Sequence, residues 1–209
     1  MVYIPILNDL CTRQKQYNQQ QIKIKIMSTF NVPTREEVSA NNQAIFDTLK
    51  GKLGFVPNLY ATYAYSDNAL SNYLTLSGAK TSLSAKEKEV VNLAVSEVND
   101  CIYCLSAHTA IGKMNGFTDE QILELRAGHA SFDTKFDALA RLAKNITENR
   151  GRTDEAVLEN FFNAGYTKEN LIDTIVLVGD KTISNYIHQT TQIPVDFPVA
   201  QPLEALTEV

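Results

Sequence analysis

The sequence has few cysteines and no surplus of positive charge, and each shortage excludes a class of protein. Only three of the 209 residues are cysteines, Cys11, Cys101 and Cys104, so they cannot supply a disulfide framework for a fold of this size. The 24 acidic residues outnumber the 19 basic ones and give a net charge of -5, which leaves no basic surplus to neutralise a phosphate backbone. We therefore expect neither a disulfide-stabilised fold nor a nucleic-acid partner.

Long apolar runs are missing as well. The longest apolar stretches, such as residues 171–178, fall well short of the roughly 20 residues that cross a bilayer. The opening residues Met1 to Pro5 lack the basic start of a secretory signal. We expect a soluble, cytoplasmic protein without a membrane partner.

Strand signals are rare, and the composition favours one helical domain. With 44% hydrophobic residues the chain can build one sizeable core, and it is too short to require two. Convincing alternation of period two occurs only in residues 22–26, so the predicted class is all-α. Residues 1–26 form either a short strand or ordered arm, or an extension upstream of a native start at Met27, and Cys11 within them is interpreted as incidental. Residues 27–209 are the predicted helical domain.

Sequence signals for helix starts and helix ends recur along the chain from Thr34 onward. Thr34 with Glu37, and Ser84 with Glu87, have the form of capping boxes. Three junctions share the order Gly-x-Thr, in which the glycine ends one helix and the threonine caps the next. The predicted helices span residues 34–50, 58–65, 67–79, 84–99, 101–115, 118–127, 132–149, 153–164 and 167–192.

The last predicted helix, 167–192, carries a stripe of apolar residues at three-to-four-residue spacing. Its members are Leu171, Ile172, Ile175, Val176, Ile183, Tyr186 and Ile187. We expect this face to be buried against other helices.

The segment that indicates chemistry contains a C-x-x-C pair, Cys101 and Cys104, followed by His108. Residues three and four apart share one face of a helix, with Cβ atoms about 5 to 6 Å apart. A modest distortion of the first turn would let the two sulfurs bond. If Asn99 or Asp100 caps the helix, the first-turn N–H groups stabilise a thiolate. We expect Cys104 to be the more acidic thiol if His108 assists it, although the Asp100 carboxylate opposes a thiolate.

Three other interpretations of this segment stay open. A structural zinc site would need four ligands, whereas the segment offers Cys101, Cys104 and His108, and only His129 and His188 remain elsewhere. The cysteines could be buried and inert, and His108 could be a hydrogen-bonded core residue. His129 and His188 are interpreted as having no role in the site. We favour a redox-active dithiol without a metal or cofactor.

The spacing of Glu89, the two cysteines and His108 is E-x11-C-x2-C-x3-H, and it resembles the AhpD-like alkylhydroperoxidase and carboxymuconolactone decarboxylase family. Within that family the sequence is most similar to the peroxidase-related branch. Weaker similarity extends from Leu53 to Asp196. The resemblance implies an AhpD-like all-helical fold, a homo-oligomer such as a trimer or hexamer, and thiol peroxidase chemistry.

In the chemistry that the resemblance implies, peroxide attacks Cys104, Cys101 resolves the sulfenic acid to a disulfide, and Glu89 with His108 manages protons. A lipoylated protein is the dithiol reductant of the AhpD enzymes. The sequence departs from them at Tyr103, where they carry a second histidine between the cysteines. Two alternatives remain: a decarboxylase-type enzyme acting on a small lactone, and a non-enzymatic redox sensor or binding module.

The rise of a helix selects Glu89 rather than Glu97 as the partner of His108. If helices 84–99 and 101–115 fold back on each other, Glu89 lies roughly 15 Å from the turn and His108 roughly 12 Å. Glu97 lies near the level of Cys101, where its charge would oppose a thiolate. We therefore predict a Glu89–His108 pair.

Overall fold

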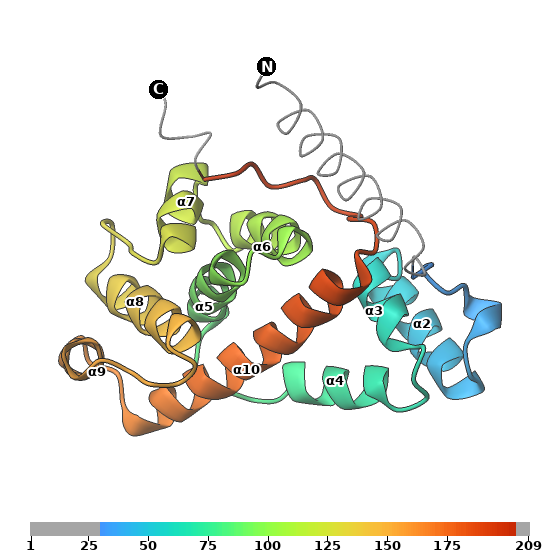
Figure 1. Ribbon diagram of the computed structural model, residues 1–209, viewed down its shortest axis with the longest axis horizontal. Helices are drawn as coiled ribbons and strands as arrows, with labels where there is room; N and C mark the ends of the chain where they lie inside the picture. The colour runs from blue at the N-terminus through green and yellow to red at the C-terminus, as the bar shows by residue number, and fades with distance from the viewer. Residues whose placement is uncertain (1–29, 204–209) are drawn as a thin grey trace, which may run out of the picture. The chain divides into compact units, whose positions relative to one another are not determined.

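The computed structural model describes residues 30–203 as a single all-helical domain (Figure 1), as the sequence predicted. The expected extension over residues 1–26, with Cys11, lies outside the described residues. The elements are η1 (Arg35–Glu37), α2 (Ala40–Leu53), α3 (Asn58–Tyr63), α4 (Ala69–Ser77), α5 (Ala85–Val98), α6 (Ile102–Met114), α7 (Asp119–Ala127), α8 (Thr134–Glu148), α9 (Glu155–Asn163) and α10 (Lys168–Thr191). Within that range no helix is both long and apolar enough to span a membrane.

Local capping fixes most helix starts, and it also explains where one prediction was wrong. Ser84 accepts the Glu87 backbone N–H, and the Glu87 carboxylate accepts the Ser84 N–H at 2.8 Å, so α5 begins as predicted. The box at Thr34 instead starts the short η1, after which Val38 is extended. Ser39 provides a second cap and starts α2, which divides the predicted helix 34–50 in two.

Two of the three Gly-x-Thr junctions act as the sequence predicts. Gly116 and Gly165 have φ values of 86° and 92°, and Thr118 and Thr167 cap the helices that follow. At the third junction the N-cap of α9 is Asp154 rather than Thr153.

Helix α5 is the centre of the domain. It contacts α6, α7, α8 and α10, and its residues Val90, Leu93 and Val95 are fully buried. A second group of buried side chains joins α2, α3 and α4 to the start of α6, and it contains both Cys101 and Cys104. The dithiol therefore lies at the boundary between the central bundle and the N-terminal helices.

The segment after α10 covers the bundle from outside. In Figure 1 it runs back past α3 and α6 toward α7. The Asp196 carboxylate accepts the Asn58 N–H of α3 at 2.7 Å, and the Ala200 N–H donates to Ser106 of α6 at 3.0 Å. This return places Phe197 beside Tyr103, with ring centroids 5.6 Å apart.

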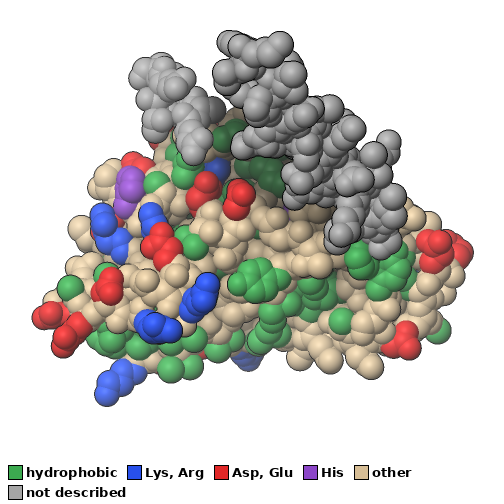
Figure 2. Space-filling view, in the orientation of Figure 1, with side chains coloured by type: hydrophobic (Ala, Val, Ile, Leu, Met, Phe, Trp, Pro, Cys, Tyr) green, Lys and Arg blue, Asp and Glu red, His purple; other side chains and the backbone are tan. Residues whose placement is uncertain are grey.

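The expectation that the apolar stripe of α10 is buried was wrong for most of its length. Ile172 and Tyr186 are 60% and 61% exposed, and Ile175, Val176 and Ile183 are exposed as well. Figure 2 shows hydrophobic side chains gathered on the face where α10 crosses the domain. The buried residues of α10 are mostly polar instead, since Val178 is joined by Thr174, Asp180, Lys181, Ser184, Asn185 and His188. Periodicity identified an apolar face but not what covers it.

We expect a second copy of the chain to cover the exposed face of α10, because removing this apolar surface from water favours association. Wild-type protein should then have a mass above the 23.3 kDa of one chain in light scattering. Ile175→Glu should shift the mass toward that of a monomer, because it places a charge on the face. Val199→Glu changes another exposed apolar residue, outside α10, and is the control. A monomeric wild type at micromolar concentration would contradict this expectation.

Candidate active site

The turn between α5 and α6 sets the position of the dithiol. Asp100 adopts a left-handed conformation with φ 50°, and the Cys101 N–H returns to the Ser96 carbonyl at 2.9 Å. Aspartate is among the few residues that tolerate this conformation. The turn therefore reverses the chain within two residues and starts α6 directly beside the end of α5.

Two side chains of α10 hold this turn. Asn185 accepts a hydrogen bond from the Asn99 side chain at 2.9 Å and donates one to Ser96 at 3.3 Å. Gln189 donates to the backbone carbonyls of Asn99 and Asp100. The polar inner face of α10 thus satisfies the exposed backbone groups of the turn and fixes its shape.

Cys101 is itself the N-cap residue of α6, so the expectation that Asn99 or Asp100 caps this helix was wrong. Its side chain is fully buried, and Cys104 lies one turn further on and is 2% exposed. Both cysteines are free thiols in this structure. The two thiols lie close together, and each shifts the pKa of the other.

This contact separates the acidities of the two thiols in the opposite order to the sequence expectation. The hydrogen bond from Cys104, helped by His188 and the Cys104 N–H, outweighs burial and lowers the pKa of Cys101 to about 5. The hydrogen bond to Cys101 and burial raise the pKa of Cys104, against the charge of Lys181. The contact between the thiols therefore favours a negative charge on Cys101 over one on Cys104.

Glu89 and His108 form the pair that the helix geometry predicted. The His108 Nδ1 lies 2.7 Å from Glu89 Oε2, and Asn92 donates to Glu89 Oε1 at 3.0 Å. Burial would raise the pKa of Glu89, but the charge and hydrogen bond of His108 outweigh it and lower that pKa. The ionised carboxylate accepts from Nδ1–H and leaves Nε2 as the basic ring nitrogen.

Glu97 is not part of the site. Its carboxylate lies 2.6 Å from Nε of Arg126, whose side chain is buried. His129 lies 3.4 Å from Glu124 on an exposed turn. Among residues 30–203, no three His, Cys, Asp or Glu side chains form a group that could hold a metal ion.

His188 belongs to the site, contrary to its interpretation from sequence. It is 3% exposed, contributes a hydrogen bond that lowers the pKa of Cys101, and has no partner for Nδ1 among the described residues. Its ring lies 5.4 Å from that of Tyr103. Lys181 and Asn185 of α10 also act on Cys104. No local pattern indicates these three residues, because they lie some 80 positions from the cysteines.

Tyr103 has a structural role between the two cysteines. Its hydroxyl accepts the Leu59 N–H at 3.1 Å, which ties α6 to α3, and its ring packs between His188 and Phe197. The imidazole next to Cys101 therefore comes from α10 rather than from the residue between the cysteines.

A cavity of about 380 Å³ opens onto the dithiol. We call it the dithiol cavity. Cys104, His108 and Lys181 line it, whereas Cys101 does not. The rest of its wall is mostly apolar and includes Leu53, Phe55, Pro57, Leu59, Tyr60, Tyr73, Tyr103, Ala107, Ile111, Met114, Ser184 and Phe197. Cys104 is thus the sulfur that a small molecule can reach.

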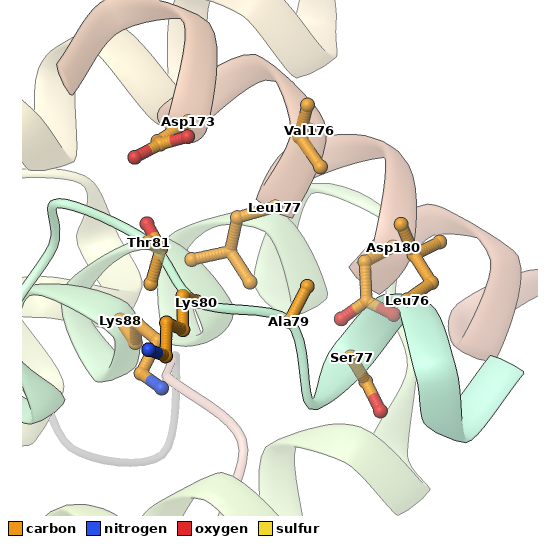
Figure 3. A pocket seen from close by; sticks show the side chains of 10 residues that line it. All are labelled: Leu76, Ser77, Ala79, Lys80, Thr81, Lys88, Asp173, Val176, Leu177 and Asp180. Carbon is orange, nitrogen blue, oxygen red and sulfur yellow. The ribbon is translucent and has the colours of Figure 1, made fainter. Parts of the chain in front are cut away.

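A neighbouring hollow of about 50 Å³ lies between the segment after α4 and the first half of α10 (Figure 3). Asp180 lines this hollow, and burial raises the pKa of its carboxyl group. Its successor Lys181 lines the dithiol cavity instead. The side chains of Asp180 and Lys181 therefore line two different cavities.

Comparison with known proteins places the site in a defined family segment. Residues 65–145, which include Glu89, both cysteines and His108, match the Carboxymuconolactone decarboxylase family. No curated protein matches the sequence.

Solved structures share the fold at low sequence identity. A peroxidase-related protein from Silicibacter sp. TM1040 superposes with a TM-score of 0.69 at 22% identity, covering 82% of this chain and 91% of that one. A peroxidase-related protein from Ralstonia eutropha JMP134, described as an alkylhydroperoxidase AhpD core, gives 0.70 at 20% identity, covering 84% and 93%. A variant of the debrominase Bmp8 in complex with 2,3,4-tribromopyrrole gives 0.65 at 14% identity, covering 87% and 97%. The fold is therefore AhpD-like.

The low pKa of Cys101 leads to a prediction for His188. In a Cys11→Ser background, one equivalent of thiolate should absorb in the ultraviolet at neutral pH and disappear as the pH falls through about 5. His188→Gln should move this midpoint upward, because a hydrogen bond to the thiolate is lost. The control His129→Gln removes an exposed histidine and should leave the midpoint unchanged. An unshifted midpoint in His188→Gln would rule out this role.

Proposed function

We propose that the chain is a cytoplasmic thiol-dependent hydroperoxide reductase, because residues 65–145 match the Carboxymuconolactone decarboxylase family and its fold is AhpD-like. The observation that carries the proposal is the pair of buried free thiols one helical turn apart, of which Cys104 lines a cavity together with His108. A dithiol in which one thiol has a lowered pKa is prepared for oxidation to a disulfide.

The proposed reaction begins with transfer of the Cys104 proton to the Cys101 thiolate. The Cys104 thiolate then attacks the terminal oxygen of the hydroperoxide, which carries the hydrogen. The O–O bond breaks, and Cys104 becomes a sulfenic acid. Protonated His108 supplies the proton that the departing alkoxide needs, which yields an alcohol. The Cys101 sulfur next attacks the Cys104 sulfur, the disulfide forms as the S–O bond breaks, and the leaving hydroxide takes the proton of the Cys101 thiol to become water. Two thiols are oxidised while one hydroperoxide is reduced to an alcohol and water.

Access and acidity support different cysteines as the attacking group, and we give access more weight. Cys101 carries the thiolate at rest, but it is fully buried and does not line the dithiol cavity. Cys104 lines the cavity, and the positive charge of Lys181 stabilises its thiolate. The contact between the thiols lets the proton pass between the sulfurs, so Cys101 serves as the base for Cys104.

Glu89 prepares His108 for its part in this reaction. The carboxylate fixes the ring through Nδ1 and leaves Nε2 free to take up and return a proton. Asn92 holds the second carboxylate oxygen and prevents Glu89 from turning away. The reductant that we propose is a dithiol such as a lipoylated protein, because a disulfide is regenerated by exchange with a second dithiol.

The proposed reaction predicts different roles for the two sulfurs. Peroxide should remove two titratable thiols from the wild type, and a dithiol should restore them. Cys104→Ser should abolish peroxide consumption, whereas Cys101→Ser should accumulate a sulfenic acid that dimedone traps on Cys104. Mass spectrometry of the adduct locates the sulfur. An adduct on Cys101 in the Cys104→Ser protein would show the reverse order of roles.

The same assay, run with dihydrolipoamide, thioredoxin and glutathione side by side, separates the alternatives. Catalytic turnover with any of them supports the reductase. Disulfide formation without turnover favours a redox sensor. Turnover of a small lactone by Cys104→Ser favours a decarboxylase-type enzyme.

The proposed reaction also predicts an effect of the Glu89 carboxylate on the rate. Glu89→Gln should lower kcat/KM for peroxide by about tenfold or more, because His108 loses the carboxylate that orients its ring for proton transfer. The control Glu97→Gln should leave the rate unchanged, and it should lower thermal stability because buried Arg126 loses its counter-charge. Steady-state kinetics and a melting curve measure the two effects. Equal rates in wild type and Glu89→Gln would discard the Glu89–His108 pair as part of the mechanism.

A further inference from the structure

We propose that the dithiol cavity selects hydroperoxides that combine a small apolar or aromatic body with one carboxylate, and that Lys181 binds the carboxylate. This inference rests on the proposed function and names its substrate class. The reacting sulfur of Cys104 and the ammonium group of Lys181 would then hold the two ends of one molecule.

The first observation is that Lys181 is buried without a partner. Its exposed fraction is 6%, and it lines the dithiol cavity together with Cys104 and His108. The described residues 30–203 offer its ammonium group neither a hydrogen bond nor an ion pair within 4.0 Å. Arg126, which is similarly buried, is satisfied by Glu97 and by the Gln201 carbonyl. Lys181 differs because no described carboxylate lies within ion-pair distance of it, although its charge acts at longer range on Asp180, Glu89 and Cys104.

The nearby carboxylates do not fill this role. Glu89 is engaged on both oxygens, by His108 and by Asn92. Asp180 precedes Lys181 in the chain, but it faces the separate hollow of Figure 3. An unpaired buried charge is strongly destabilising, and buried charges in proteins are normally paired. A ligand that brings a negative charge into the cavity would supply the missing partner.

The walls of the cavity define the rest of the ligand. Five aromatic side chains contribute to the lining, and Lys181 and His108 are its only cationic groups among the described residues. A volume of about 380 Å³ accommodates one or two rings with a short polar group. Hydrogen peroxide would use none of the apolar surface, whereas an aryl hydroperoxide with a carboxylate would use both the rings and Lys181.

A direct binding experiment tests this inference without any peroxide. Calorimetry on the reduced protein compares 2-naphthoate with 2-naphthamide, which have the same shape and differ in charge. Wild type should bind naphthoate about tenfold more tightly than naphthamide or better. Lys181→Met should bind the two equally. Lys113→Met, which removes an exposed lysine paired with Asp119, should retain the wild-type preference.

A kinetic experiment separates anion binding from an effect of Lys181 on the Cys104 thiolate. The substrates are cumene hydroperoxide and its 4-carboxy derivative. Lys181→Met should raise KM for the carboxylated substrate about tenfold and leave KM for cumene hydroperoxide within about twofold. An equal change in KM for the two substrates, or no change for either, would overturn carboxylate recognition, whereas an effect on the thiolate alone lowers kcat equally for both.

The two experiments also distinguish this inference from the proposed function. If no hydroperoxide is consumed, the reductase proposal fails, while a charge preference that depends on Lys181 would still support the anion site. If naphthoate does not bind at millimolar concentration, or if Lys181→Met keeps the preference, the anion site is wrong even where peroxide is reduced.

Discussion

The reversal of the chain at Asn99 and Asp100 is the constraint on which the site depends. Because the turn is only two residues long, α5 and α6 lie side by side, and Glu89 meets His108 far from the turn itself. The left-handed Asp100 leaves backbone carbonyls that α10 must satisfy, and Gln189 does so. The positions of the thiols and of the Glu89–His108 pair are therefore set by hydrogen bonds from a helix that lies far away in the sequence.

The polar composition of the inner face of α10 follows from its hydrogen bonds to the turn between α5 and α6. A helix that packs by apolar contact alone would turn its stripe inward, but α10 turns Asn185, His188 and Lys181 toward α5 and α6. These polar groups hold the turn, lower the pKa of Cys101 and contribute positive charge near Cys104. The apolar stripe is left on the outside. Helix α10 thus has polar side chains on its inner face and an exposed apolar surface on its outer face.

Sequence reasoning succeeded where the physics is local. Capping boxes and left-handed glycines are decided by contacts within a few residues, so α5, α7 and α10 begin close to where they were predicted. The Glu89–His108 pair could be predicted because both helices leave one turn at a known rise per residue. His188 and Lys181 could not, because only tertiary packing brings them to the cysteines. The expectation that Cys104 is the more acidic thiol, which assumed help from His108, was wrong for the same reason.

The placement of the charges also explains why the residue between the cysteines need not be a histidine. An imidazole at that position would compete for the space in which Tyr103 joins α6 to α3. Here His188 reaches Cys101 from α10, while His108 stands on the cavity side of Cys104 with Glu89 behind it. The two histidines therefore serve different sulfurs. Cys101 is enclosed by the protein, whereas His108 lies with Cys104 on the wall of the dithiol cavity.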